Sequence, residues 1–192
     1  MTHPDKSEQE ITMEYETTTG PAIIAAARAF DGTEAGAVAA EEILNAVTAP
    51  AHVIAASAAW VVRRIAGHAN TVGTTEWDHR DDDEADRTLD EAMTGIHHGG
   101  RQKDPNLSVD ADRAMTALVD LARVRDDEER LSYAEVWVNN PQKSLAIAYV
   151  GAQLVRMLAD MTGDAGSALD GLACEVMALA AITTTTKEGI TE

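Results

Sequence analysis

Apolar residues recur along this chain at spacings of three and four, the period of a helix that is buried on one side. The clearest example lies between Asn140 and Gly163. The Asn140 side chain can accept a backbone N–H, and Pro141 then takes the first helical position, where its missing N–H costs nothing. Gly163 follows the last apolar turn and can adopt the left-handed conformation that commonly ends a helix. The pattern predicts a helix over 141–162.

Polar residues inside this predicted helix form one narrow stripe, made of Gln153, Arg156 and Asp160. The remaining positions are mostly apolar or small, which predicts neighbouring helices on nearly every side. Gly151 would let a neighbour approach closely, and Arg156 can pair with Asp160 four residues later or reach another chain. We therefore interpret Gly151, Arg156 and Asp160 as candidate interaction residues.

The same period predicts helices over most of the remaining chain. They are expected at 22–30, 34–47, 51–68, 84–97, from Ser108 onward, from Ser132 onward, and from Asp164 or Ser167 to about Ile182. The segment after Ser132 also alternates like a strand, but a lone short strand would have no partner. Residues 1–20 are polar without a helical period and predict a flexible acidic tail, and residues 183–192 predict a second flexible tail.

The helix expected at 34–47 is capped by Thr33 in this interpretation. Its buried face is predicted to consist of Ala35, Val38, Ala39, Ile43 and Val47.

These elements predict an all-α fold, a single-domain bundle of about six to eight helices over 21–182. We expect the last two helices to form a central C-terminal hairpin, because the link between them is only a few residues long. The polar interval 70–83 could divide the domain into two helical parts.

Composition adds one strong constraint, a formal net charge of −18 over 192 residues. So acidic a surface opposes direct nucleic-acid binding, which depends on Lys and Arg, and it favours basic partners. The acidity could serve solubility alone, or it could imitate nucleic acid on a DNA-binding protein. Aromatic residues make up only 4% of the chain, so the core must be built from small and aliphatic side chains.

Cysteine usage and hydropathy point to a reducing compartment. Cys174 is the only cysteine, and its position beside apolar residues predicts a buried, inert thiol. The N-terminus lacks the apolar core of a signal peptide, and no run is apolar enough to span a membrane. We therefore expect a cytoplasmic protein without membrane contact.

The densest cluster of reactive groups lies in the acidic segment 78–90. Asp83, Asp86 and Asp90 would share one helical face and, with His79 or His97, could hold Mg²⁺ or Mn²⁺ through hard ligands. Alternatively the segment is a hydrated, acidic helix start, which the helix dipole favours.

Tryptophan is scarce, and Trp77 is unusual because it stands among polar and acidic residues. Such a side chain either contacts a partner or folds back onto the core. Trp77 is therefore a fourth candidate interaction residue.

Together these features predict a non-catalytic acidic helical protein that requires no cofactor. It would act as an accessory, regulatory or structural factor by binding another protein or by forming a homo-oligomer, a role that would also suit a phage or mobile-element accessory protein. Two alternatives remain open. One is a Mg- or Mn-dependent nucleotide or phosphoester hydrolase, and the other is a nucleic-acid mimic that inhibits a DNA-binding protein.

Overall fold

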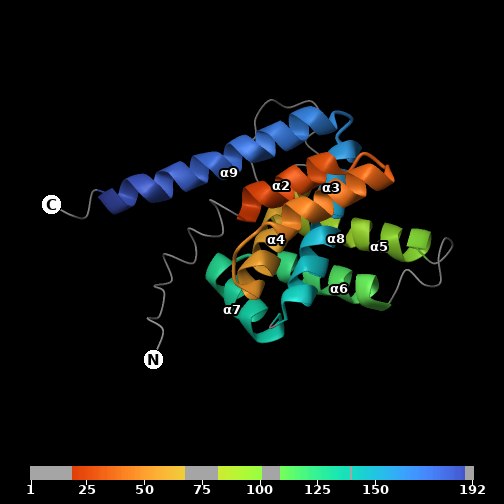
Figure 1. Ribbon diagram of the computed structural model, residues 1–192, viewed down its shortest axis with the longest axis horizontal. Coiled ribbons are helices and arrows are strands. Elements are labelled where there is room, and N and C mark those ends of the chain that lie inside the picture. Colours follow the sequence, from red (N-terminus) through yellow and green to blue (C-terminus); the bar gives the residue numbers. More distant parts are fainter. Residues whose placement is uncertain (1–18, 68–81, 101–108, 139, 189–192) are drawn as a thin grey trace.

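The computed structural model of the chain describes residues 19–67, 82–100, 109–138 and 140–188. In these ranges the chain forms helices without any strand, which confirms the predicted all-α class (Figure 1). The helices are α2 (Gly20–Ala29), α3 (Glu34–Asn45), α4 (Ala51–Ala66), α5 (Asp82–Gly100), α6 (Val109–Arg123), α7 (Asp127–Trp137), α8 (Pro141–Met161) and α9 (Ala165–Glu188).

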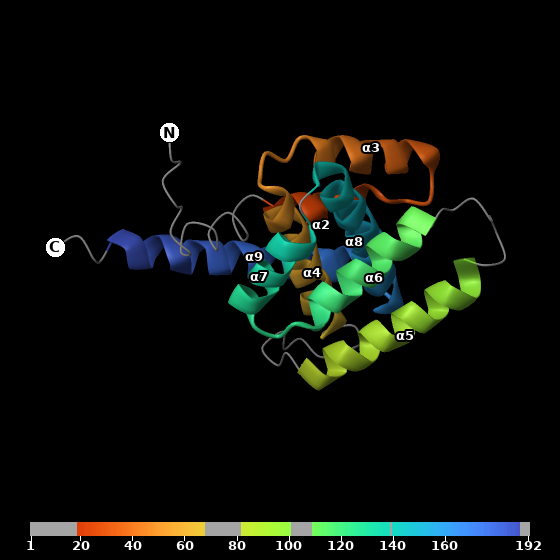
Figure 2. The same cartoon turned by 90° about the horizontal axis from the view of Figure 1, so that it is seen from below.

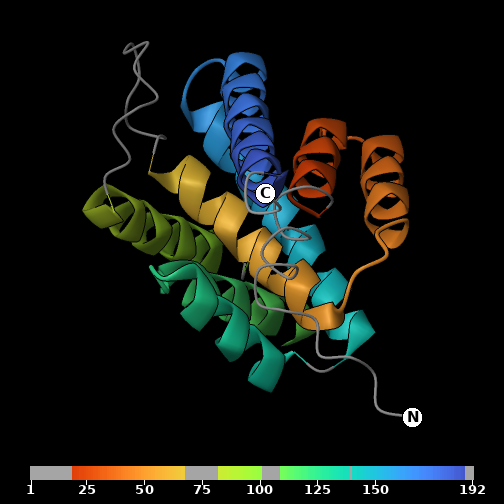
Figure 3. The same cartoon turned by 90° about the vertical axis from the view of Figure 1, so that its left-hand side faces the viewer.

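Helix α4 runs through the middle of the molecule. From Val53 to Ala66 every side chain except that of Arg64 is buried. Its alanines let neighbouring helices approach closely. Helix α8 makes the most extensive contact with α4, and α2, α5, α6 and α7 also contact it. Figure 3 shows α4 with the green α5, α6 and α7 on one side and the red and orange α2 and α3 on the other. The central pair is thus α4 with α8, whereas the sequence suggested α8 with the final helix.

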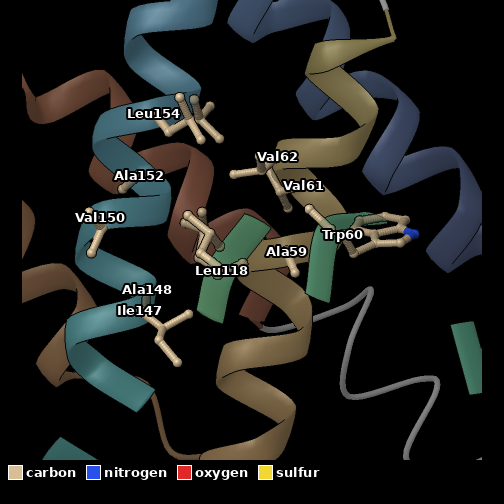
Figure 4. Close-up of a cluster of buried hydrophobic side chains, with 14 of the residues drawn as sticks. Ala59, Trp60, Val61, Val62, Leu118, Ile147, Ala148, Val150, Ala152 and Leu154 are labelled. Atoms are coloured by element: carbon tan, nitrogen blue, oxygen red, sulfur yellow. The ribbon is translucent and has the colours of Figure 1, made fainter. Parts of the chain in front are cut away.

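Helices α4 and α8 approach each other closely at Gly151. A Cβ atom at this position would lie 3.1 Å from Cβ of Ala58 and 3.5 Å from Cδ1 of Leu118. Figure 4 shows the apolar side chains of α4, α6 and α8 that fill the space around this contact, including Val62, Leu118 and Leu154. Gly151 is therefore a packing residue inside the protein.

The ends of α8 match the sequence pattern. The Asn140 side chain accepts the backbone N–H of Gln142 at 2.8 Å, and Pro141 begins the helix. Gly163 follows with a φ of +85°, in the left-handed region that glycine favours. Local sequence signals therefore determine both ends of this helix.

Helix α3 begins after Thr33, whose hydroxyl accepts the Gly36 N–H at 3.0 Å as predicted. Its predicted buried face was only partly right. Ala35 and Val38 are exposed, whereas Ile43 and Val47 are partly buried against the core, and the fully buried positions are Gly36, Ala40 and Leu44. A Cβ atom on Gly36 would lie 2.5 Å from the Ala29 carbonyl oxygen, so α3 approaches α2 closely at this glycine.

Two helix boundaries also differ from the sequence expectation. Helix α7 starts after Asp126, which accepts the Glu129 N–H at 2.9 Å, so Ser132 lies inside the helix and does not cap it. Helix α9 starts after Asp164, which accepts the Ser167 N–H at 3.1 Å. It continues to Glu188, beyond the predicted end near Ile182, so residues 183–188 are helical.

The first half of α9 packs on the main body. Its buried residues include Leu169, Leu172 and Val176, and it contacts α2, α8 and α4. Figures 1 and 2 show the C-terminal turns of α9 extending past the other helices. The described residues before and after the interval 68–81 contribute to one buried apolar cluster.

Candidate binding groove

The acidic face of α5 points at arginines of neighbouring helices. Asp86 accepts from Arg63 at 2.8 Å and from Arg125 at 2.9 Å. Arg125 also reaches Asp83 at 2.6 Å. Asp82 accepts from Arg63 at 2.7 Å, and Asp90 pairs with Arg123. The predicted spacing of Asp83, Asp86 and Asp90 therefore places them on one face, where each carboxylate meets a guanidinium group.

These ion pairs change the titration of Asp86. Partial burial alone would raise its pKa, but the hydrogen bonds from Arg63 and Arg125 outweigh burial, and the pKa is lowered from its usual 3.8. The same contacts with Asp86 and Asp83 raise the pKa of Arg125. The side chain of Arg63 is only 2% exposed, and it also donates to the Ala122 carbonyl at 3.0 Å. The carboxylates of α5 thus compensate a buried cation.

A metal at this face would have to displace those arginines. Among the described residues, no group of three or more His, Cys, Asp or Glu side chains is arranged to hold a metal ion. His79 and the side chain of His97 lie outside the described part of the molecule. Binding of Mg²⁺ or Mn²⁺ therefore stays a prediction, without a preformed ligand set among the described acids.

The predicted interaction residues lie apart from one another. Arg156 pairs with Asp160 at 3.1 Å on the exposed side of α8, as their spacing suggested. Gly151 faces α4 in the interior. Trp77 lies outside the described residues. A separate expectation was wrong: Cys174 is exposed, because it lies beside the stripe of α9 that packs on the body.

The corner between α6 and α7 is held by a buried arginine. Arg130 is 1% exposed, and its Nε donates to the Leu121 carbonyl at 3.2 Å. Its other nitrogens contact the Val124 carbonyl and the Asp127 carboxylate. These bonds satisfy carbonyls at the end of α6 that have no partner within the helix. Arg130 thereby fixes α7 against the end of α6.

Helices α6 and α7 both pack on α4, and they contact each other much less. Between them, and closed at one end by the start of α8, lies a groove of about 680 Å³. Its apolar lining is supplied by Ala117, Leu121, Val124, Tyr133, Trp137 and Val138. Its rim carries Asp120, Arg123, Arg125, Asp126, Glu129 and Lys143.

One wall of the groove exposes large aromatic side chains. Trp137 is 66% exposed and Tyr133 is 48% exposed. Glu129, Tyr133 and Trp137 follow at intervals of four residues, so they line up along one face of α7. The Lys143 ammonium group donates to the Trp137 carbonyl at 2.7 Å and ties this end of α7 to the start of α8.

The helical spacing of residues in α7 predicts this wall of the groove, but the same segment also alternates like a strand, so the wall was not predicted. Once α7 is helical, Arg130, Ala134 and Val138 lie on its buried face at intervals of four. Tyr133 and Trp137 then belong to a neighbouring apolar face that lines the groove and stays largely exposed. Large apolar side chains that stay exposed beside a packed face indicate a binding surface.

No helix in the described part of the chain is long and apolar enough to cross a membrane. Comparison with protein-family models, curated proteins and solved structures finds no match to this chain.

Proposed function

We propose that this protein is a non-catalytic binding protein that takes a segment of another protein into the groove between α6 and α7. The observation that carries the proposal is Trp137, a large aromatic side chain that is 66% exposed beside an apolar floor. Water contact with such a side chain is unfavourable, and interface hot spots are enriched in Trp and Tyr. Burial under a bound segment would remove this cost.

The polar groups of the groove also suit binding better than chemistry. Arg123 and Arg125 are engaged in ion pairs with α5, and Asp126 caps α7. These groups are thus engaged by other parts of the fold and border an apolar floor. The acidic α5 face, the basis of the alternative hydrolase hypothesis, is likewise occupied by arginines.

A peptide selection tests the proposal. Helical and extended 16-residue peptides displayed on phage would be selected on the purified full chain, and the affinities of the enriched peptides measured. We expect Trp137→Ala to weaken binding by about a hundredfold, as truncation of a hot-spot aromatic does. The matched control is Val136→Ala, because Val136 is 76% exposed on the same helix but does not line the groove.

Equal binding by both variants would mean that the peptides bind elsewhere, and the proposal would be wrong. The solution mass of the wild type and of Trp137→Ala separates self-association from binding of another protein. A dimer that becomes a monomer in Trp137→Ala would make a second copy of this chain the groove's partner.

A further inference from the structure

We propose that the segment bound by this groove is a basic amphipathic helix. It would place an aliphatic or aromatic anchor beside Trp137 and a Lys or Arg about two turns away, opposite Glu129. This inference rests on the groove being the binding site proposed above, and it adds the shape and the charge of the partner.

The arginines of the rim already form ion pairs with carboxylates of α5. Arg123 pairs with Asp90, and Arg125 reaches Asp83 at 2.6 Å and Asp86 at 2.9 Å. Arg125 donates hydrogen bonds to both carboxylates, and these bonds raise its pKa. An acidic partner would therefore have to compete with α5 for both guanidinium groups.

The carboxylates of the rim have fewer ion-pair partners than its arginines. The Glu129 carboxylate has no ion-pair or hydrogen-bond partner among the described residues. Asp120 lies 3.9 Å from Arg123, at the limit of an ion pair, while Arg123 also binds Asp90. The Lys143 ammonium group donates to the Trp137 carbonyl. The side of the groove near Glu129 therefore attracts a cation.

The shape of the groove suits a helix. Ala117 and Leu121 of α6 face Glu129, Tyr133 and Trp137 of α7 across the groove. Two helical walls with side chains at intervals of four residues form the kind of groove that receives the apolar stripe of a third helix. Binding by strand addition would need a sheet edge, and the described chain has no strand.

Spacing along α7 gives the partner's pattern. Glu129 and Trp137 are eight residues apart, which corresponds to about 12 Å along a helix. A partner helix lying alongside would therefore carry its basic residue seven or eight positions from its anchor, in either chain direction. A second copy of this chain fits poorly, because its net charge of −18 is repelled by the same carboxylates.

The peptides selected on the wild-type chain provide the probe, and charge reversal at two adjacent positions provides the test. Glu129→Lys places a cation in the groove, whereas Glu128→Lys makes the same change in net charge on an exposed residue outside it. Both positions lie in the first turn of α7, so the cost to the helix dipole is matched. Thermal unfolding of both variants would establish that they fold.

We expect the enriched peptides to be cationic, with Lys or Arg seven or eight residues from an apolar anchor. Glu129→Lys should weaken their binding at least about tenfold and Glu128→Lys less than about threefold, since only the first removes a direct charge contact. Equal losses would show that net charge alone attracts the peptides, and would overturn this inference. Neutral or acidic peptides whose binding still requires Trp137 would also overturn it, while leaving the proposed function intact. Binding that does not require Trp137 would overturn both.

Discussion

Helices α4 and α7 each carry a tryptophan, and the two side chains differ greatly in their exposure to solvent. Trp60 in α4 is 2% exposed, and the Arg64 guanidinium lies 4.4 Å from its ring centroid. Trp137 in α7 is 66% exposed. In a protein with 4% aromatic residues, one of these rings fills the core and the other lines a groove.

The difference comes from the number of neighbours that each helix has. Helix α4 is surrounded by other helices, and its small residues allow close approach, as at the contact between Ala58 and Gly151. Helix α7 packs on α4 and buries Ala134, while the neighbouring face that carries Tyr133 and Trp137 lines the groove toward α6 and stays largely exposed. Apolar residues alone therefore do not define the core of this protein, because their burial depends on which faces find partners.

The largest effect should come from exchanging the two tryptophans for alanine in separate variants. Trp60→Ala should lower the free energy of unfolding by about 3–5 kcal/mol, because it removes a large buried side chain. Trp137→Ala should change it by less than about 0.5 kcal/mol, since the side chain is mostly in water. Urea unfolding followed by circular dichroism measures both. A large loss in Trp137→Ala would mean that this ring supports the fold, and the binding role would have to be abandoned.

Substitutions on the packed side of α8 should lower the free energy of unfolding more than substitutions on its exposed side, though less than Trp60→Ala does. Gly151→Leu should cost about 2–3 kcal/mol through overpacking, because even a Cβ atom there lies 3.1 Å from Ala58. Gln153→Leu, on the exposed stripe of the same helix, should stay within about 0.5 kcal/mol. Thermal unfolding of the two variants gives the comparison. Similar melting temperatures would contradict the central position of the α4–α8 contact.

The smallest effect concerns the ionic contact that holds α5 against α4. The pKa of Asp86 is lower in the folded protein than its usual 3.8, so its contribution to stability is complete above that value. The contribution is lost as the pH falls through the lowered pKa. Wild type should therefore be more stable than Asp86→Asn at about pH 6, and the difference should shrink toward about pH 3.

Asp31 and Asp164 also have lowered pKa values, owing first to their side-chain hydrogen bonds with Thr33 and Ser167. They titrate in both proteins and cancel in the comparison. Urea unfolding across this range provides the measurement. A difference that stays constant with pH would exclude ionisation of Asp86 as its source.

Local signals in the sequence were sufficient to predict that these segments are helical. The caps at Thr33 and Asn140 and the stop at Gly163 act within a few residues, so their physics is contained in the local chain. The exposed stripe of α8 also followed from periodicity, since Gln153 and Asp160 are exposed. The partly wrong face of α3 shows the limit, because the shortest distance between two helices is set by small residues such as Gly36.

Little of the candidate site could be predicted from the sequence. The acids of α5 were recognised as a cluster, but their partners Arg63 and Arg125 come from helices far away in the chain. The groove requires that α6 and α7 diverge at a corner held by Arg130. Neither arrangement has a local signature, because both depend on long-range packing against α4.

The sequence by itself determined an all-helical chain with a strongly acidic surface, since helix period, caps and charge are properties of neighbouring residues. Tertiary structure alone decided which apolar faces are buried and which carboxylates meet arginines. Those outcomes depend on where each helix lies relative to the others, and the exposed wall at Trp137 exists because α6 and α7 contact each other little while both pack on α4.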